Sequence, residues 1–450
     1  MPTDSNTQRA GKPRAARASF AAAISTSLEW YDFFIYATAA ALVFNATFFA
    51  TDSQVVAALN SFATVAVGFV ARPIGGVLAG HFGDKVGRKP VLVAAIVMMA
   101  VATSLIGLVP NTQLVWLAPT ILVTLRICQG LAVGAQWGGA VLLATENAPA
   151  GRRGFYGSFA QLGVPIGVVL GNVVFLVITA VFDSESFLAW AWRIPFWISL
   201  VMLPVAFVIH RYLEETPEFR ELSKKLAEAP VARKSPILQV LRNNPGTVLT
   251  AAGANAIGVI FFYTMITGSV QFATTYLGIE RSTVLGFILA ACVLMIPLVP
   301  LAGYLSDIYG RKLIFGIGTA GMLLWGIPMW LMIGQSSQGT LWPFALAVFG
   351  AVIVMSFQTG TQGTLFAELF PPEIRFSGAS LGYQISAIIG GFSPMVMVLL
   401  INGDASNAWR VGAFLAGAGA IGLLCLVAIV RKYSSPDVAQ VTARRSTVAV

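Results

Sequence analysis

The 450-residue sequence has few charged residues: Asp, Glu, Lys and Arg make up 10% of the chain, whereas hydrophobic residues make up 57%. Soluble globular chains carry about 25% charged residues, and the mean hydropathy here is +0.79, so the composition excludes a soluble protein. Cysteine and histidine are scarce as well. Cys128, Cys292 and Cys425 lie in apolar stretches, and His81 and His210 are far apart in the sequence. We therefore expect neither a disulfide framework nor a metal site.

Two kinds of chemical motif are also missing. The sequence has no Gly-x-x-x-x-Gly-Lys-Ser/Thr loop, which argues against a built-in nucleotide-driven motor. It also has no Ser/His or His/Glu/His arrangement that would support an intramembrane enzyme. We expect no enzymatic activity and no cofactor.

Twelve apolar stretches are long enough to cross a bilayer, whose hydrocarbon core needs about 20 apolar residues per helix. The last six repeat the spacing of the first six. We predict an all-α membrane protein with twelve transmembrane helices in two pseudo-symmetric six-helix bundles, residues 19–209 and 246–430. The predicted stretches lie near residues 19–44, 55–80, 90–109, 114–145, 155–181, 188–209, 246–273, 283–306, 312–333, 341–367, 377–401 and 409–430.

The net charge of +9 could indicate nucleic-acid binding, but the distribution of the basic residues argues against it. Of the 28 Lys and Arg, 23 lie in seven segments that would face one side of the membrane. Positive residues favour the cytoplasmic side. We therefore expect a multi-pass protein of the plasma (inner) membrane, and a monomer that contacts the lipid bilayer. Its disordered N-terminus (1–18), its linker (210–245) and its tail (431–450) would all be cytoplasmic.

A ten-residue pattern occurs twice, 223 positions apart: Gly80-His-Phe-Gly-Asp84-Lys-Val-Gly87-Arg88-Lys89 and Gly303-Tyr-Leu-Ser-Asp307-Ile-Tyr-Gly310-Arg311-Lys312. A second pair starts at Glu146 and Glu368, 222 positions apart, and contains Arg153 in the first copy and Arg375 in the second. Both pairs lie at equivalent helix junctions. The chain is therefore two copies of one architecture, which indicates a duplicated transporter.

The repeated motifs have the chemistry of a conformational latch. Gly80 and Gly87 allow close helix approach and a tight turn, and Asp84 can pair with a cation across a helix contact. Contacts of this kind could break and re-form as the protein alternates between states. Charges that only set the membrane topology are the alternative. The predicted latch residues are Gly80, Asp84, Gly87, Arg88, Glu146, Arg153, Asp307, Arg311, Glu368 and Arg375.

Four ionisable residues lie at membrane depth: Glu29, Asp32, Arg72 and Arg126. An unpaired charge at the bilayer centre costs at least about 2.5–3.5 kcal/mol, so each residue needs a partner or a watery cavity. With a rise of about 1.5 Å per residue, Asp32 lies about 18 Å into the first helix, and Arg126 lies about as deep in the fourth from the opposite side. Glu29 and Asp32 are three residues apart and share one helical face.

A buried carboxylate beside an arginine that it can gain or lose can bind and release a proton. We predict that Asp32 carries the proton, that Glu29 tunes it, and that Arg126 binds a substrate carboxylate when Asp32 is protonated and pairs with Asp32 otherwise. Arg72 would form an ion pair from the second helix. A static ion pair is the alternative for all four residues.

Uncharged polar residues of the apolar helices are candidates for the substrate site, although Gln or Asn in a membrane helix as often joins two helices. The candidates are Tyr31, Tyr36, Gln129, Gln136, Trp137, Gln161, Asn255, Tyr263, Gln358, Gln362, Tyr383 and Gln384.

The sequence resembles the major facilitator superfamily and, within it, the metabolite:proton symporter family. The repeated loops resemble the superfamily signature. More specific are Leu28-Glu-Trp-Tyr-Asp-Phe33, Ala71-Arg-Pro-Ile-Gly-Gly76, Leu125-Arg-Ile-Cys-Gln-Gly130, Trp192-Arg-Ile-Pro-Phe196, Phe366-Ala-Glu-Leu-Phe-Pro371 and Ser377-Gly-Ala-Ser-Leu-Gly-Tyr-Gln384. The resemblance covers nearly all of residues 20–430 and implies an importer of small organic acids or zwitterions that is driven by protons. The sequences of the fourth and eleventh helices are most similar to the shikimate-type branch.

One departure from the family pattern affects the expected mechanism. Many relatives have Gly-Gly-Glu where this chain has Gly134-Ala135-Gln136. Glu29 and Asp32 are then the only acids deep in the membrane, so proton coupling must rest on the first helix or be weaker than in relatives.

The interpretation that we test is a proton-coupled symporter that imports a small organic acid by alternating access, with its site between the two halves. One alternative is an osmolyte carrier for proline or betaine. Such carriers often have a long C-terminal coiled coil, and the segment after residue 430 has no heptads. The other alternative is a non-transporting sensor on a transporter scaffold, which would need a signalling domain larger than the 210–245 linker.

Overall fold

The structure is a computed structural model of the chain and describes residues 5–44, 48, 54–83, 86–110, 116–212, 220–221 and 236–434. Regular structure in these residues is helical, apart from an isolated bridge between Ser337 and Thr340. The helical elements before the linker are α1 (Ser5–Ala39), η1 (Ala40–Phe44), α3 (Gln54–Gly83), α4 (Arg88–Ile106), α5 (Leu117–Glu146), α6 (Arg153–Ser158), η2 (Phe159–Gln161), α7 (Gly163–Val181), α8 (Ser184–Ala189), η3 (Ala191–Arg193), α9 (Ile194–Ile198), η4 (Ser199–Val201) and α10 (Met202–Tyr212).

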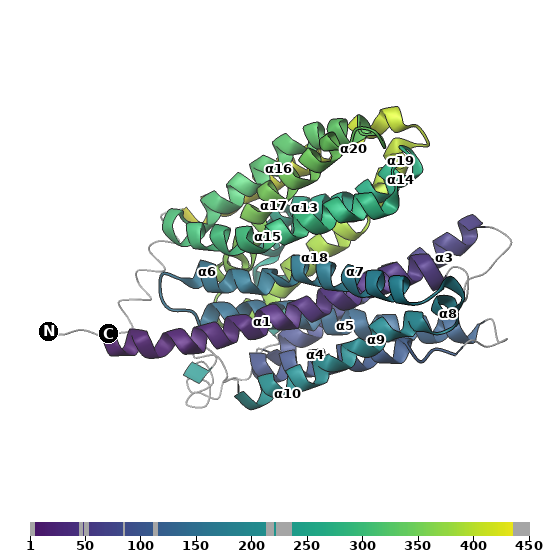
Figure 1. Cartoon of the computed structure of the whole chain (residues 1–450). Helices are drawn as coiled ribbons and strands as arrows, with labels where there is room; N and C mark the ends of the chain where they lie inside the picture. Colours follow the sequence, from purple (N-terminus) through teal and green to yellow (C-terminus); the bar gives the residue numbers. More distant parts are fainter. Residues whose placement is uncertain are drawn as a thin grey trace.

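The elements from residue 236 onward begin with α12, which lies within the 210–245 linker, and from α13 on they repeat the plan of the first six long helices. They are α12 (Pro236–Asn243), α13 (Pro245–Tyr263), η5 (Thr264–Gly268), α14 (Ser269–Thr275), α15 (Arg281–Tyr309), α16 (Arg311–Gly334), α17 (Trp342–Glu368), α18 (Arg375–Gly391), α19 (Ser393–Ile401), η6 (Ala405–Asn407) and α20 (Ala408–Ser434). Figure 1 shows α13 to α20 grouped on one side of the molecule and α1 to α10 on the other. We call α1 to α10 the first half and α13 to α20 the second half.

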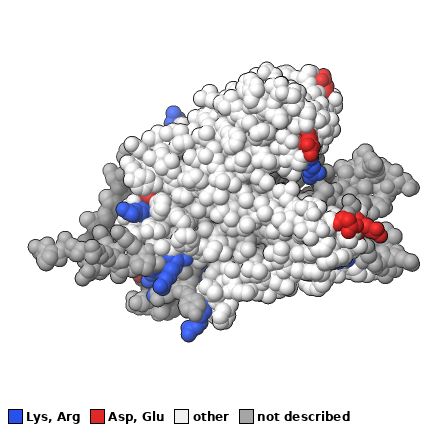
Figure 2. All heavy atoms as spheres, viewed as in Figure 1, with Lys and Arg blue, Asp and Glu red and all other residues white. Residues whose placement is uncertain are grey.

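Ten described segments are long and apolar enough to span a membrane. Together with the long helices α1 and α3 they make twelve helical segments, which agrees with the predicted all-α membrane fold. Figure 2 shows a broad band with almost no charge between two ends that carry it. Large apolar side chains such as Leu324, Leu399 and Leu424 are about 70% exposed, which suits contact with lipid chains.

Helix packing within the two halves is matched. In the first half α1 packs on α7, α3 on α5, and α4 on both α5 and α10. In the second half α13 packs on α18, α15 on α17, and α16 on both α17 and α20. Single turns of π-helix, η1 and η5, also occupy corresponding places in the first helix of each half. The structure therefore repeats the duplication that the motifs indicate.

One expected boundary needs correction. Residues 1–18 were expected to be disordered, whereas α1 begins at Ser5. The segment is rich in Ala and Arg, which are strong helix formers. It also makes tertiary contacts, because Ala15 and Ala18 are fully buried and the Arg14 Nε donates a hydrogen bond to Asn147 Oδ1 at 3.0 Å.

Candidate functional site

The four ionisable residues predicted at membrane depth are all buried. Glu29 is 3% exposed, Asp32 0%, Arg72 6% and Arg126 3%. They come from three different helices of the first half: α1, α3 and α5. Because ionised groups are rarely buried without partners, the contacts of each side chain determine what it can do.

Both carboxylate oxygens of Asp32 accept hydrogen bonds from hydroxyl groups. Thr103 on α4 donates to Oδ2 at 2.7 Å, and Ser199 on η4 donates to Oδ1 at 2.5 Å. Thr103 in turn accepts a hydrogen bond from Gln129 Nε2 at 2.7 Å. Asp32 is therefore held inside the first half by neutral donors.

Arg126 contacts aromatic rings and one amide. Its Nη1 donates to Gln129 Oε1 at 3.1 Å, and its guanidinium carbon lies 4.1 Å from the centre of the Tyr36 ring and 5.5 Å from that of Phe33. The Nε atom is buried and has no hydrogen-bond partner among the described residues. Instead of the expected direct pair, Arg126 and Asp32 are joined through Gln129 and Thr103.

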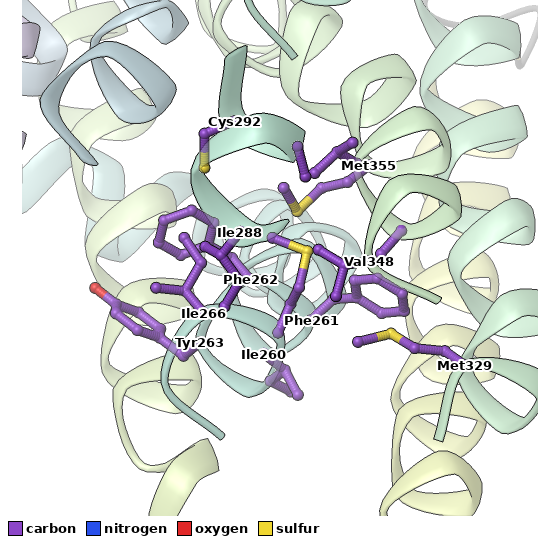
Figure 3. Close-up of a cluster of buried hydrophobic side chains, with 14 of the residues drawn as sticks. Ile260, Phe261, Phe262, Tyr263, Ile266, Ile288, Cys292, Met329, Val348 and Met355 are labelled. Carbon is purple, nitrogen blue, oxygen red and sulfur yellow. The ribbon is translucent and has the colours of Figure 1, made fainter. Parts of the chain in front are cut away.

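Tyr263 of α13 brings the second half against these charges. Its ring centre lies 5.7 Å from that of Phe69 and 6.0 Å from that of Phe33. Its side chain interacts with those of Arg72, Arg126 and Glu29. Figure 3 shows the Tyr263 hydroxyl directed away from the apolar cluster that contains its neighbours on α13. The charged residues of the first half and the polar edge of α13 therefore meet at one place between the halves.

Glu29 is less tightly held than Asp32, and Arg72 packs on aromatic rings. The Glu29 Oε2 is buried without a hydrogen-bond partner among the described residues. The Arg72 guanidinium carbon lies 4.4 Å from the Phe69 ring centre and 5.3 Å from that of Phe33. No ion pair within 4.0 Å joins these two side chains in the part of the chain that the structure describes.

Four of the predicted polar residues are hydrogen-bonded inside their own half. The Tyr31 hydroxyl donates to the Pro195 carbonyl at 2.8 Å. The Asn255 amide donates to Ser386 at 2.7 Å, and that of Gln358 donates to Thr319 at 3.0 Å. Gln129 belongs to the series of hydrogen bonds that links Arg126 to Thr103 and Asp32. These contacts give the four residues a role in joining helices, which needs no ligand.

Other predicted polar residues keep a buried atom that has no hydrogen-bond partner among the residues that the structure describes. These atoms come from both halves and would be costly in an apolar interior, so they mark where a polar ligand could bind. They are Gln136 Oε1, Trp137 Nε1, Gln161 Nε2, Gln362 Nε2 and Gln384 Oε1.

Several of these residues meet across the boundary between the halves. The Trp137 and Tyr383 rings stack with centres 4.0 Å apart and planes 3° apart. The Gln384 amide donates to the Gly134 carbonyl at 3.4 Å.

Within the first half, Gln136, in place of the usual Glu, donates to the Ser25 carbonyl at 2.6 Å. An ionised carboxylate could not make that last contact, because it has no hydrogen to donate.

Thr103, Ser199 and Ser380 were not predicted. The first two hold Asp32, and Ser380 carries a further buried hydroxyl without a hydrogen-bond partner in the described part of the chain. Hydroxyl residues are common in membrane helices, where they usually bond to their own backbone. Only Ser380 had a local signal, its place in the Ser377-Gly-Ala-Ser380 motif.

The second copy of the repeated motif joins the two halves. Asp307 Oδ1 and Oδ2 accept hydrogen bonds from the backbone N–H groups of Gly154 and Phe155 at 2.9 and 2.8 Å. These groups lie at the start of α6, where a carboxylate is favoured. The Asp307 Oδ1 also lies 2.7 Å from Arg311 Nη2, and Arg311 Nε lies 3.4 Å from Glu368 Oε1.

The first copy makes a related contact on the same end of the molecule. Arg88 Nη2 donates to the Pro372 carbonyl at 3.2 Å, and Arg375 Nη1 lies 3.4 Å from Glu146 Oε1. Both contacts cross the boundary. Arg88 Nε lies 3.7 Å from Glu146 Oε2 within the first half. Asp84 lies outside the described residues.

The latch glycines permit this geometry. A Cβ atom on Gly80 would lie 2.8 Å from the Ser377 Cα atom, so α3 and α18 could not approach as closely with a larger residue. Gly87 has a φ of 124°, which other residues rarely adopt. The Arg153 carbonyl accepts a hydrogen bond from Thr364 at 3.2 Å across the boundary.

Comparison with known proteins agrees with this architecture. Residues 22–394 match the Major Facilitator Superfamily. The chain is 35% identical to the shikimate transporter of Escherichia coli K12 over 89% of its length and 91% of that protein. It is 37% identical to the inner membrane metabolite transport protein YhjE of the same organism, over 90% of its length and 92% of that protein.

More distant relatives include proline/betaine transporters, and a solved structure shares the fold. The chain is 30% identical to the proline/betaine transporter of E. coli K12 over 91% of its length and 82% of that protein. The structure of the proton:xylose symporter XylE bound to 6-bromo-6-deoxy-D-glucose superposes with a TM-score of 0.75 at 20% identity, over 94% of this chain and 96% of XylE. The chain belongs to the Major Facilitator Superfamily and is a membrane transporter, not an enzyme.

Proposed function

We propose that this transporter is a proton-coupled symporter that imports a small organic acid, shikimate-like or another mono- or dicarboxylate, across the inner membrane by alternating access. Arg126 carries this proposal. It is 3% exposed, lies beside Tyr263 of the second half, and has no carboxylate within ion-pair distance among the described residues. A buried cation is costly without an anion, and a substrate carboxylate would supply one.

The other residues of the site have complementary roles in this proposal. Asp32 takes up the proton, and Glu29 modulates the proton affinity of Asp32. Arg72 lies at the same boundary between the halves, beside Tyr263. The atoms without partners on Gln136, Trp137, Gln161, Gln362 and Gln384 bind the remaining polar groups of the substrate. The 35% identity to the shikimate transporter over 89% of the chain supports a carboxylate as substrate.

We assign the two bundles to residues 19–209 and 246–430, with the 210–245 linker and both termini in the cytoplasm. In the view of Figure 2, most of the Lys and Arg lie at the end where the N-terminus is drawn, and most of the Asp and Glu lie at the opposite end. This distribution supports the assignment. The latch contacts of Asp307 and Arg375 would then close the cytoplasmic end, and alternating access would require them to break.

Replacing Asp307 with Asn should slow transport without weakening substrate binding. The NH₂ group of Asn would face one of the two N–H groups of Gly154 and Phe155, which bond to different oxygens of Asp307, and the contact with Arg311 would lose its charge. The closed cytoplasmic end must also re-form in every transport cycle, and the substitution would make it form less often. Charge-assisted hydrogen bonds are worth about 1.5–3 kcal/mol each, so the uptake rate should fall about tenfold or more. Initial uptake rates in proteoliposomes, together with the equilibrium Kd of the detergent-purified protein, measure the two quantities separately.

Asp183 provides a matched control for this substitution. It also accepts hydrogen bonds from the first N–H groups of a helix, Glu185 and Ser186 on α8, but it is exposed. Asp183→Asn should leave the uptake rate nearly unchanged. A loss of binding in Asp307→Asn with an unchanged uptake rate at saturation would contradict the latch.

A second candidate, an osmolyte carrier for proline or betaine, is favoured by the 30% identity to the proline/betaine transporters. Thermal unfolding of the purified protein with shikimate, 2-oxoglutarate, citrate, proline or betaine separates the two functions. A ligand at 100 times its Kd stabilises the folded state by about 2.7 kcal/mol. We expect carboxylates without an ammonium group to raise the Tm. Stabilisation by proline and betaine alone would establish the alternative instead.

A further inference from the structure

A continuous chain of hydrogen bonds joins Arg126 to Asp32. Arg126 Nη1 donates to Gln129 Oε1 at 3.1 Å, Gln129 Nε2 donates to Thr103 Oγ1 at 2.7 Å, and Thr103 Oγ1 donates to Asp32 Oδ2 at 2.7 Å. All four side chains are at most 3% exposed. The hydrogen bonds join α5, α4 and α1. Because the four side chains are buried, bulk water does not compete for these hydrogen bonds.

The direction of this chain is determined by its two ends. A guanidinium can only donate hydrogen bonds, and an ionised carboxylate can only accept them. Between them, the Gln129 amide must present its oxygen to Arg126 and its N–H to Thr103. The single hydroxyl hydrogen of Thr103 must then point to Asp32. This arrangement fits an ionised Asp32 and an Arg126 side chain that is held by its hydrogen bond to Gln129.

We propose that Thr103 and Gln129 form a relay that transmits the protonation state of Asp32 to the guanidinium of Arg126. They are positioning residues, because neither contacts the substrate in the proposed function. Their role is to make Arg126 available to a substrate anion only after Asp32 has taken up a proton.

Protonation of Asp32 reverses the relay. The Oδ2 atom gains a proton from water on the side to which the site is open, and becomes a donor to Thr103. The Thr103 hydroxyl turns to donate to Gln129, and the Gln129 amide rotates to offer its oxygen. Its NH₂ group then faces Arg126, where two donors oppose each other. Arg126 loses its hydrogen-bond partner and is released. Loss of the proton to the opposite side restores the original direction.

Few ionisable side chains surround Asp32, and the relay is the hydrogen-bonded connection between Asp32 and Arg126. The ionisable side chains that interact with Asp32 are Arg126 on α5, and Glu29 and Tyr31 on its own helix. The helix α7, which packs along α1, contains no charged residue. Of the other ionisable residues on the elements against α1, Cys128 lies within α5. The rest lie at or near helix ends: Arg88 and Lys89 on α4, Arg153 and Tyr156 on α6, Glu146 on α5, and His210, Arg211 and Tyr212 on α10.

Infrared difference spectroscopy of the full chain in lipid, without any substrate, tests the relay. Spectra are recorded as a function of pH on unlabelled and ¹⁵N-arginine protein. The carboxylic acid band of Asp32 is identified by its absence in Asp32→Asn, and the guanidinium band of Arg126 by its absence in Arg126→Lys. In the wild type we expect both bands to change together, with one midpoint.

Four variants separate a relay from direct electrostatic coupling. Thr103→Val and Gln129→Leu keep the side-chain volume and remove the relay, so the Asp32 band should still titrate while the response of the Arg126 band is lost. Thr103→Ser should restore that response. Ser199→Ala is the matched control: it removes the other hydroxyl donor to Asp32 but leaves the relay intact, and both bands should still change together.

Three results would overturn the relay. They are an Arg126 response that persists in Thr103→Val and Gln129→Leu, separate midpoints for the two bands in the wild type, or a wild-type Asp32 band that does not titrate. If Thr103→Val does not fold, Gln129→Leu gives the same information. The biological meaning of the relay rests on the proposed function, but the measurement uses no substrate. An error in the substrate class would therefore change the uptake results and leave the spectra as expected.

Discussion

The replacement of Asp32 with Asn is expected to abolish uptake against a concentration gradient while preserving exchange of substrate across the membrane. Asn keeps the size of the side chain and has one donor and one acceptor, as a protonated Asp does. It can still bond Thr103 and Ser199, whose hydroxyl oxygens lie 2.7 and 2.5 Å from the carboxylate. It cannot bind or release a proton, so an imposed proton gradient would no longer drive accumulation.

Proteoliposomes measure both activities of this variant. Accumulation is followed with the outside more acidic than the inside, and exchange is followed as counterflow of labelled substrate at equal pH. Glu29→Gln is the matched variant one helical turn away on α1, and we expect it to keep a reduced accumulation. If Asp32→Asn still accumulates substrate and Glu29→Gln does not, Glu29 is the proton carrier and our assignment is wrong.

The replacement of Arg126 with Ala is expected to destroy binding of a carboxylate substrate. The bound anion would be buried beside Tyr36 and Phe33 without its counter-charge, and breaking a buried ion pair costs about 3–5 kcal/mol, which is a factor of at least about 100 in Kd. Arg126→Lys should restore only part of the affinity, because an ammonium group cannot make the two parallel hydrogen bonds of a guanidinium. Binding to the purified protein can be measured calorimetrically with shikimate.

Arg72 provides the comparison for this result. It is the other buried cation beside Tyr263 and also packs on Phe33. We expect Arg72→Ala to weaken binding less than Arg126→Ala does. The reverse order would place the substrate carboxylate on Arg72.

Much of the fold could be predicted from the sequence, because membrane helices and internal duplication leave strong local signals. Twelve apolar stretches and two motif pairs 222 and 223 residues apart indicated the two matched halves. The N-terminal boundary was wrong because polarity was interpreted as disorder, although the segment from Ser5 has the helix-forming residues to extend α1.

The site was only partly predictable. Scarcity of charge made Glu29, Asp32, Arg72 and Arg126 conspicuous, and all four are buried together. Their partners were not visible, because contacts between helices depend on the rotation of each helix. Thr103 is 71 residues from Asp32 in sequence and Ser199 is 167 residues away.

The polar candidates show the same limit. Asn255 and Gln358 form hydrogen bonds within the second half, whereas Gln136 and Gln384 each keep an oxygen without a partner in the described ranges. All four are amides in apolar helices, and composition alone cannot separate an amide that joins two helices from one that faces a ligand. Helix packing makes the distinction.

The central claim, proton-driven import of an organic acid, is tested most directly by uptake of labelled shikimate into proteoliposomes that contain the wild-type protein. With the outside more acidic than the inside, we predict transient accumulation above the external concentration, and its loss when a protonophore collapses the gradient. Internal shikimate that never exceeds the external concentration and is indifferent to the gradient, in vesicles that do accumulate betaine, would contradict the account.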